Sequence, residues 1–320
     1  MSNAAALFPP DRIILREVGL RDGLQLVRQF PDTRAKQQWL QHEYAAGVRM
    51  FEVGSFLPVS RFPQFADVRE MLSSVKALPG AHAAALTLNE RGAEDALGSS
   101  VDEMVFVISA TEGHSQANTR RSRDQALALL SRIAAMRDAA GPGAPVLTAG
   151  IAMAFGCSIE GDVDPNEVLH LVDACLQAGA DVVALADTVG YAGPRDVAKL
   201  AAAARKLARE VPLAMHFHDT RGLAIANAAA ALDEGVRILD GSLGGLGGCP
   251  FAPGATGNVV FEDLVFLCET MGFDTGIDVE ALARARSVMA QAMPGEALFG
   301  ALARSGPPPT PSWRTRHKAA

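Results

Sequence analysis

The 320-residue sequence predicts an α/β fold, namely a (β/α)8 TIM barrel with additional C-terminal helices. Short apolar segments alternate with longer helical ones over about 240 residues, as in a parallel sheet with helical crossovers. Eight such apolar segments occur, the number that this barrel needs. Polar residues gather where these segments end, and the strand ends of a barrel carry its active site. A doubly wound open sheet is the alternative, but the glycine fingerprint of a dinucleotide fold is absent after the first segment.

The strands and helices can be assigned in chain order. The predicted strands are Ile13–Val18, Met50–Val53, Ala83–Leu88, Met104–Ile108, Val146–Ala154, Val182–Leu185, Pro212–Phe217 and Ile238–Leu243. The predicted helices are Thr33–Ala46, Ala66–Lys76, Arg123–Ala139, Pro165–Gln177, Pro194–Arg209 and Leu223–Glu234. Helix starts carry suitable residues, since Thr33 can act as an N-cap and Pro165 fits a first helical turn. Glycines follow several helices, as at Ala178-Gly179.

We expect one catalytic domain over residues 1–320. The barrel is predicted over about 12–258, with further helices over about 259–293. The tail over 305–320 is rich in proline and basic residues, and we expect it to be flexible.

Composition excludes several classes of protein. The net charge is −7 without a sustained basic tract, which argues against nucleic acid as a partner. Residues 1–10 lack the charged and apolar regions of a signal peptide, and no apolar stretch reaches the roughly 18 residues of a membrane span. The four cysteines follow neither metal-type nor disulfide-framework spacing. We expect a reduced, cytoplasmic protein.

Two histidines one residue apart, His216 and His218, end the seventh predicted strand. Side chains at i and i+2 of a strand point to the same face, so both imidazoles converge on one point. Asp22 adds a carboxylate oxygen, and Asn258 can add an amide oxygen. This nitrogen–oxygen set suits Mg²⁺ or Mn²⁺. A zinc site that recruits Cys249 is the weaker alternative, and hydrogen-bonded core histidines are another.

Other polar residues also follow strand ends. The first strand runs into Arg21-Asp22-Gly23, the second into Glu52 and the sixth into Asp187-Thr188. A glycine-dense loop over 241–250 follows the eighth. Each feature alone could be an ordinary turn, helix cap or surface loop. Their joint position at one rim of the barrel predicts an active site there.

Three segments resemble the 3-hydroxy-3-methylglutaryl-CoA (HMG-CoA) lyases, members of the metal-dependent lyase and Claisen-condensation barrel superfamily. They are Glu17-Val18-Gly19-Leu20-Arg21-Asp22-Gly23-Leu24-Gln25, His216-Phe217-His218-Asp219-Thr220, and the run from Gly245 through Gly247-Gly248-Cys249-Pro250 to Gly257-Asn258. The first two also occur in the condensing enzymes of the superfamily, whereas the Gly-Gly-Cys-Pro loop is more specific to the lyases. The resemblance extends from about Arg12 to Met293, nearly the whole barrel.

The resemblance implies retro-Claisen cleavage of HMG-CoA, or a close 3-hydroxyacyl-CoA, into acetyl-CoA and acetoacetate. It assigns Asp22, His216, His218 and Asn258 to a divalent metal that acidifies the substrate hydroxyl. It also implies a homo-oligomer, a dimer, with a part in leucine degradation and ketone-body formation.

Four further residues receive catalytic roles from the resemblance. Arg21 stabilises the negative charge that develops on the thioester oxygen. Cys249, on a glycine-rich loop that can close over the site, protonates the enolate carbon. Glu52 and Asp187 match acidic positions of the family and orient groups or transfer protons.

Coenzyme A is polyanionic, so an acidic protein needs a local basic patch to bind it. Arg120, Arg121 and Arg123 follow the fourth strand and are candidates; a solvated helix start is the alternative. Asn118 aligns with a polar family segment near the pantetheine. We expect Arg21, Asn118 and Arg120 to bind the acyl-CoA thioester.

The chain departs from the family pattern at several positions. The segment after Gln25 reads Leu26-Val27-Arg28, and Ala184 and Ala186 stand where the family commonly has serine and glycine. These changes leave the acyl group open, so a different branched 3-hydroxyacyl-CoA is one alternative. Two others are an acyltransferase that condenses acetyl-CoA with a 2-oxoacid, as isopropylmalate and homocitrate synthases do, and a barrel that binds acyl-CoA without catalysis.

Overall fold

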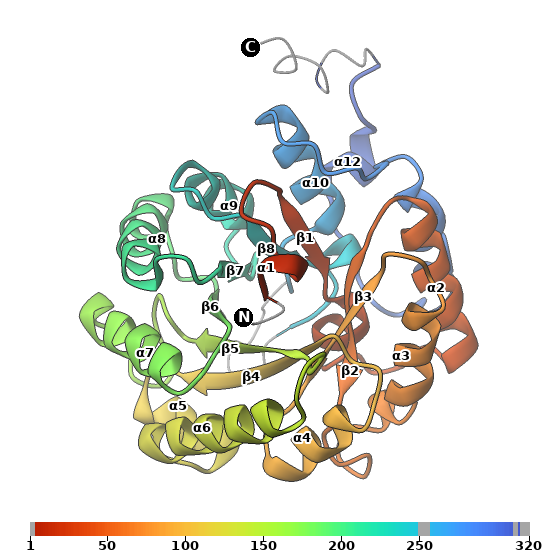
Figure 1. Ribbon diagram of the computed structural model, residues 1–320. Coiled ribbons are helices and arrows are strands. Elements are labelled where there is room, and N and C mark those ends of the chain that lie inside the picture. Colours follow the sequence, from red (N-terminus) through yellow and green to blue (C-terminus); the bar gives the residue numbers. More distant parts are fainter. Residues whose placement is uncertain (1–3, 249–256, 310–312, 314–320) are drawn as a thin grey trace.

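The computed structural model describes residues 4–248, 257–309 and 313, and its centre is a closed barrel of eight parallel strands (Figure 1). The strands are β1 (Ile14–Glu17), β2 (Met50–Ser55), β3 (His82–Leu86), β4 (Glu103–Ser109), β5 (Val146–Ala152), β6 (Val182–Asp187), β7 (Leu213–Phe217) and β8 (Ile238–Gly241). Each strand pairs with the next in the chain, and β1 pairs with β8 through Ile14 and Ile238. This last pairing closes the barrel, confirms the predicted TIM barrel and excludes an open sheet.

Helices surround the barrel. They are α2 (Thr33–Ala45), α3 (Val68–Lys76), α4 (Glu90–Leu97), α5 (Glu112–Thr119), α6 (Arg123–Ala139), α7 (Pro165–Gln177), α8 (Pro194–Ala208) and α9 (Ala224–Asp233). The six predicted helices are present. The N-cap of α2 is Asp32 and not the predicted Thr33, and the N-cap of α7 is Asp164. The sequence analysis missed α4 and α5; the glycine, serine and asparagine of α5 are typical of loops, and α4 is short and contains a glycine. Predicted strand β5 was too long, because Met153 adopts a positive φ of 60°.

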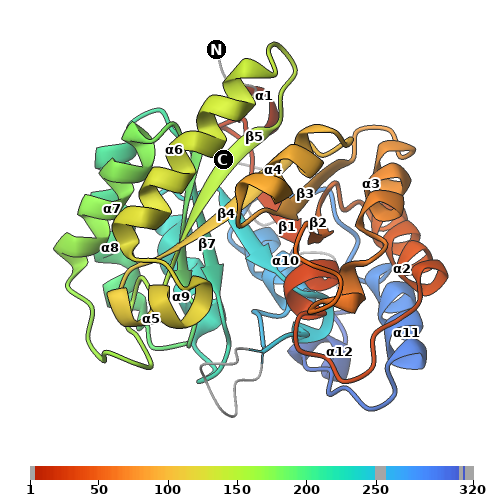
Figure 2. The same ribbon diagram turned by 90° about the horizontal axis from the view of Figure 1, so that it is seen from below.

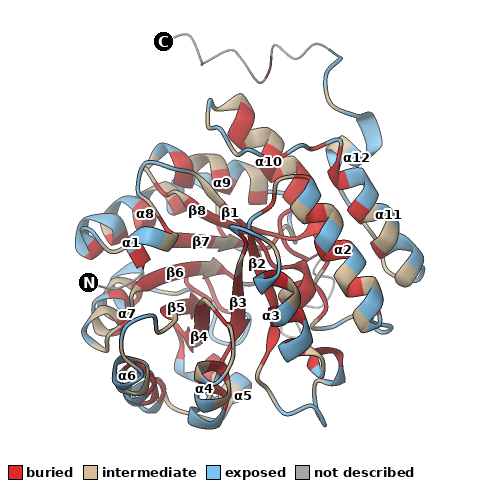
Figure 3. Ribbon diagram, turned by 45° about the vertical axis from the view of Figure 1, so that its right-hand side comes forward, coloured by how far each residue is buried: buried red, intermediate tan, exposed pale blue. Residues whose placement is uncertain are grey.

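The strands are buried on both faces, as their apolar sequences require (Figure 3). A short N-terminal helix, α1 (Ala4–Leu7), covers the end of the barrel where the strands begin. Ala4 and Phe8 pack there against Met50, Val146 and Ile238, so that this end is filled with apolar side chains. The opposite end, where the strands finish, is therefore the end that can hold a cavity. No helix among the described residues has the length and apolarity needed to cross a bilayer.

Three helices follow the barrel, namely α10 (Phe261–Thr270), α11 (Leu282–Ala292) and α12 (Ala301–Ser305). α11 packs beside α2 (Figure 2), and α10 contacts α9 and α12. In the tail, Trp313 is buried and its ring lies 4.9 Å from that of Phe266 between centroids. The sequence analysis, which expected a flexible tail over 305–320, did not anticipate this contact.

A buried glutamate, Glu17, connects the end of β1 to the segment after β8. Its Oε1 atom accepts hydrogen bonds from the backbone N–H groups of Gly19 and Leu243, both at 3.0 Å. Gly19 begins the π-helical turn η1 (Gly19–Gly23), which carries Arg21 and Asp22. A Cβ atom on Gly19 would lie 2.5 Å from the Glu17 carboxylate. Glu17 and a glycine at position 19 therefore set the position of this turn.

Burial penalises the charged form of Glu17 and raises the pKa of its carboxyl group to about 8, although its backbone hydrogen bonds oppose this effect. Burial and the neighbouring Glu17 also raise the pKa of Glu43. Because the native state holds its proton more tightly than the unfolded state, stability contributed by Glu17 is complete below about pH 4.5 and is lost as pH rises to about 8.

We expect the Glu17→Gln variant to lack this pH dependence, because its amide mimics a protonated carboxyl group. The free energy of unfolding of the wild type, minus that of the variant, should fall between pH 5 and pH 8 and then level off. Urea denaturation at several pH values measures this difference. Glu210→Gln, at an exposed position, is the charge-matched control. A difference that rises with pH would contradict the role given to Glu17.

Candidate active site

A cavity of about 340 Å³ opens at the end of the barrel where the strands finish. This volume lies within the roughly 300–1,000 Å³ that small-molecule sites occupy. Its two sides differ in chemistry. Strands β3 to β6 supply apolar or small side chains, whereas β1, β2, β7, β8 and η1 supply charged groups and imidazoles. The latter side, called the charged wall below, consists of Arg16, Arg21, Asp22, Glu52, His216, His218 and Asp240.

Three residues of the charged wall form a candidate metal site. One ligand atom each from Asp22, His216 and His218 lies within 4.8 Å of the others. The Oδ2 atom of Asp22 is 3.7 Å from Nε2 of His218. His216 lies on β7 and His218 just beyond it, so their shared face follows from strand geometry. The predicted convergence of the two histidines and Asp22 is present.

Asn258 joins these three residues from the segment after the glycine-dense loop. Its Nδ2 group donates hydrogen bonds to Oδ2 of Asp22 at 2.8 Å and to the carbonyl of Leu246 at 3.1 Å. Its Oδ1 atom is buried and has no hydrogen-bond partner among the described residues. A buried carbonyl oxygen without a partner costs free energy, and a cation would satisfy it. One carboxylate, two imidazoles and an amide oxygen fit a divalent cation.

Burial and the charges of the site shift the pKa values of Asp22 and His218 toward the protonation states that bind a metal, and that of His216 in the opposite direction. Burial raises the pKa of Asp22, but Arg21 and the two imidazoles outweigh it and hold this pKa well below its usual range. Burial lowers the pKa of His218 to about 4, so its ring is neutral at pH 7. Burial also lowers the pKa of His216, but the hydrogen bond that its ring donates to Asp240 and the charge of Asp22 leave this pKa raised.

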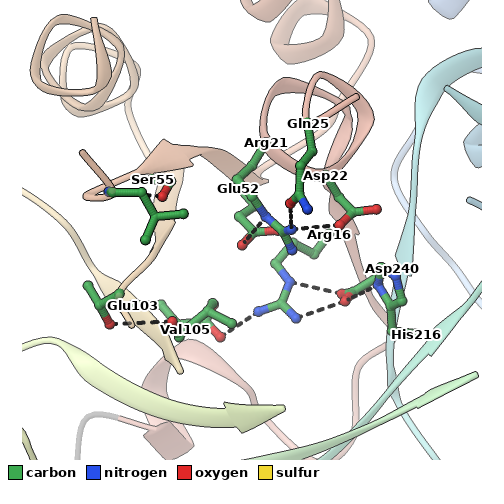
Figure 4. Close-up of polar contacts among 12 residues, drawn as sticks. Arg16, Arg21, Asp22, Gln25, Glu52, Ser55, Glu103, Val105, His216 and Asp240 are labelled. Atoms are coloured by element: carbon green, nitrogen blue, oxygen red, sulfur yellow. Dashed lines mark hydrogen bonds and ion pairs between the residues drawn. The ribbon is translucent and has the colours of Figure 1, made fainter. Parts of the chain in front are cut away.

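Arg21 lies between two carboxylates of the cavity (Figure 4). Its Nη1 group is 2.6 Å from Oδ1 of Asp22, and its Nε group is 2.7 Å from Oε1 of Glu52. Nη1 also donates to Oε1 of Gln25 at 3.2 Å. These contacts fix the guanidinium beside the metal-ligand candidate Asp22. Burial raises the pKa of Glu52, although Arg21 opposes this effect.

Behind His216 lies a buried ion-pair network that the sequence analysis missed. Asp240 accepts two hydrogen bonds from Arg16, from Nε at 2.9 Å and from Nη2 at 3.0 Å. Its Oδ2 atom is also 3.0 Å from Nδ1 of His216, which leaves Nε2 available for a metal. Nη1 of Arg16 is 2.5 Å from Glu103, on the opposite side of the barrel (Figure 4). The sequence does contain a signal for this network: charged residues stand at inward positions of otherwise apolar strands. A buried charge requires a partner of opposite charge, so these residues could have been expected to pair.

The other predicted site residues lie in different surroundings. Asp187 ends β6, is buried, and accepts hydrogen bonds from the backbone N–H groups of Tyr191 and Ala192 at 2.8 and 3.1 Å. Asp187 is absent from the cavity lining, whereas its neighbour Thr188 contributes to it. Cys249 lies outside the described residues; Gly248, immediately before it, lines the cavity.

The predicted coenzyme A residues differ in their position relative to the cavity. Asn118 lines it, as does Arg121, whose Nη1 group donates to the carbonyl of Leu88 at 3.3 Å. Arg120 is exposed, adopts a positive φ of 57° at the end of α5, and is not among the lining residues. Arg61 also lines the cavity, and the sequence analysis did not include it.

The comparison with known families agrees with this geometry. The HMGL-like family model matches residues 12–289, which include the barrel, α10 and most of α11. The chain belongs to the HMGL-like family. The predicted membership and the predicted class of enzyme, a lyase, are thereby confirmed.

Individual HMGL-like relatives match nearly the whole chain. A 3-hydroxy-3-isohexenylglutaryl-CoA/hydroxymethylglutaryl-CoA lyase of Pseudomonas aeruginosa is 39% identical over 276 residues, covering 85% of this chain and 90% of that protein. An (R)-citramalyl-CoA lyase of Chloroflexus aurantiacus is 34% identical over 312 residues, which cover 93% of this chain and 96% of that protein. The structure of an HMG-CoA lyase from Acinetobacter baumannii with coenzyme A and 3-methylmalate has a TM-score of 0.85 at 34% identity, covering 93% and 96% of the two chains.

The ion-pair network predicts the effect of Asp240→Asn in this HMGL-like protein. The amide cannot replace the carboxylate toward both Arg16 and His216, so Mn²⁺ affinity should fall about 10–100-fold. The free energy of unfolding should fall by about 3 kcal/mol, because Arg16 loses a buried partner. Electron paramagnetic resonance of Mn²⁺ and urea denaturation measure the two effects. Asp138→Asn, at a largely exposed aspartate, is the control. Unchanged Mn²⁺ affinity would exclude this orienting role.

Proposed function

We propose that this protein is a divalent-metal-dependent carbon–carbon lyase. Its substrate is HMG-CoA or a close 3-hydroxyacyl-CoA, and HMG-CoA would yield acetyl-CoA and acetoacetate. The observation that carries the proposal is the convergence of Asp22, His216 and His218 beside Arg21 in one cavity of an HMGL-like barrel. The names of the relatives support the substrate class.

In this proposal Asp22, His216, His218 and Asn258 hold the cation, which is Mg²⁺ or Mn²⁺. The mixed set of two nitrogen and two oxygen donors supports these ions over a closed zinc site. The cation supplies Lewis acidity for the tertiary hydroxyl of the substrate and positive charge for a carboxylate. Asp240 keeps the ring of His216 in the required orientation through its 3.0 Å hydrogen bond.

Arg21 stabilises the enolate form of the leaving thioester. Cleavage of the C2–C3 bond moves negative charge onto the thioester oxygen, and a fixed guanidinium in a buried site stabilises that charge. The contacts of Arg21 with Asp22 and Glu52 hold it in place before the reaction, so little reorganisation is needed. Glu52 thus acts as a positioning residue and, through its raised pKa, as a second candidate proton donor.

Cys249 protonates C2 of the enolate in this scheme. The position of Gly248 at the cavity supports this assignment. Asp187, in contrast, is proposed to act indirectly: its hydrogen bonds to the backbone of 191–192 hold the loop between β6 and α8. Asn118, Arg120, Arg121 and Arg61 are proposed to meet the pantetheine and phosphate groups of coenzyme A, because cations at a cavity entrance attract a polyanion.

The proposed function is tested with purified protein, Mg²⁺ and HMG-CoA, followed by mass spectrometry of the products. We expect acetyl-CoA and acetoacetate, loss of activity after dialysis against a chelator, and recovery with Mg²⁺ or Mn²⁺. Full activity without divalent ions would contradict the metal-dependent mechanism. Product formation from acetyl-CoA and a 2-oxoacid, with HMG-CoA left intact, would identify a condensing acyltransferase instead.

The Cys249→Ser variant tests the proton donor. A serine hydroxyl is a far weaker acid than a thiol, so kcat should fall on the order of 10²–10⁴-fold while Mn²⁺ affinity stays the same. Cys157→Ser is the matched control, since Cys157 is buried and contacts the Thr111 hydroxyl at 3.2 Å. Turnover close to that of the wild type would remove Cys249 from the mechanism and favour Glu52 as the donor.

A further inference from the structure

Gly150 lies in the middle of β5, where the backbone does not require a glycine. Its φ is outside the left-handed region, and it pairs in regular register with Val107 of β4 and Ala184 of β6. A Cβ atom added there would be 3.7 Å from the carbonyl oxygen of Phe106 and 3.8 Å from Cγ2 of Val107, both ordinary contacts. Glycine weakens a strand interior and often marks a close approach by a ligand. The missing side chain therefore leaves room in the cavity, which Gly150 lines.

The neighbouring inward positions are also small. Ala152 on β5 and Ala184 and Ala186 on β6 line the cavity together with Gly150. Bulky branched residues usually fill the interior layers of such barrels. Here the four small residues leave a hollow that extends from the level of His216, which is in register with Ala186, down to the level of Ala184. These two levels are two residues apart, or about 6.6 Å along a strand.

The wall around this hollow is apolar. Leu86 and Leu88 contribute to it from β3 and the residues that follow, and Val105 and Val107 contribute from β4. In the barrel order β1 to β8, β4 lies opposite β8. The candidate metal ligands come from η1, β7 and the segment after β7, on the two sides of β8. The apolar hollow therefore faces the metal site across the cavity.

A tetrahedral C3 atom directs its substituents toward these two sides. The hydroxyl and one carboxylate-bearing arm face the charged wall in the proposed function, and C2 leads to the thioester. The fourth substituent then points away from the charged wall, toward β4 and β5. In HMG-CoA this substituent is only a methyl group, which leaves most of the hollow unfilled.

We propose that the preferred substrate carries at C3 an alkyl chain of about four to six carbons, the length that two residue levels of a strand accommodate. This inference rests on the proposed lyase function and specifies its substrate. The C2–C3 bond breaks, the C3 hydroxyl loses its proton and becomes a ketone, and C2 gains a proton. The products are acetyl-CoA and a 3-oxo acid that retains the alkyl chain.

The test compares kcat/KM for HMG-CoA and for 3-hydroxy-3-butylglutaryl-CoA with saturating Mg²⁺. Burial of one methylene group raises kcat/KM about fourfold, and the butyl compound has three more methylene groups than HMG-CoA. Wild-type kcat/KM for the butyl compound should therefore exceed that for HMG-CoA by up to about sixty-fold. A lower value for the butyl compound than for HMG-CoA overturns the alkyl-chain inference but not the lyase function. Cleavage of neither thioester overturns both.

Variants of Gly150 show where the chain binds. The quantity to compare is kcat/KM for the butyl compound divided by kcat/KM for HMG-CoA. Gly150→Val fills the hollow and should lower this ratio at least about tenfold. Gly150→Ala should lower it less, and its extra Cβ fits the fold without close contact. Gly295→Ala, with no atom within 4 Å of the added Cβ, is the control and should leave the ratio unchanged. An equal loss for both thioesters would mean that the hollow holds a part common to both, and would overturn the inference.

Discussion

The hydrogen bonds of Asp240 connect the stability of the barrel interior to the geometry of the site. One carboxylate accepts two hydrogen bonds from Arg16 and contacts His216, while Arg16 reaches Glu103 across the barrel. Burial raises the pKa of Asp240, but Arg16 and His216 lower it to about 2, so it remains charged at neutral pH. Because each buried charge has a partner, the network is tolerated in an interior of low dielectric. The orientation of His216 thus depends on residues from three other strands.

The other charged residues of the site also lie on one side of the cavity. Arg21, Glu52 and Asp22 lie on the same side as this network, whereas strands β3 to β6 contribute no ionised group to the cavity lining. An apolar wall opposite a charged one excludes water and strengthens electrostatic interactions on the charged side. The same division gives a substrate with a polar and an apolar end a defined orientation.

Much of this arrangement was predictable from local sequence. The alternation of apolar and helical segments predicted the eight strands, and the spacing of His216 and His218 predicted that both side chains share a face. The pairing of Arg16 with Asp240 was not predictable in this way, since the two residues are 224 positions apart and meet only because β1 pairs with β8. Asp187 has the same strand-end position as the metal-ligand candidates, yet its carboxylate turns to the backbone of the following loop. Strand-end position indicates the rim of the barrel but not the direction of a side chain.

The N-terminal segment that covers the other end of the barrel affects how the protein can be handled. Because Ala4 and Phe8 cover that end, substrate and product would pass through the opening beside the metal-ligand candidates. A chain that began only a few residues further along would expose to water apolar side chains of six strands, β1, β2 and β5 to β8. Such truncated chains would tend to self-associate, since exposed apolar patches promote aggregation.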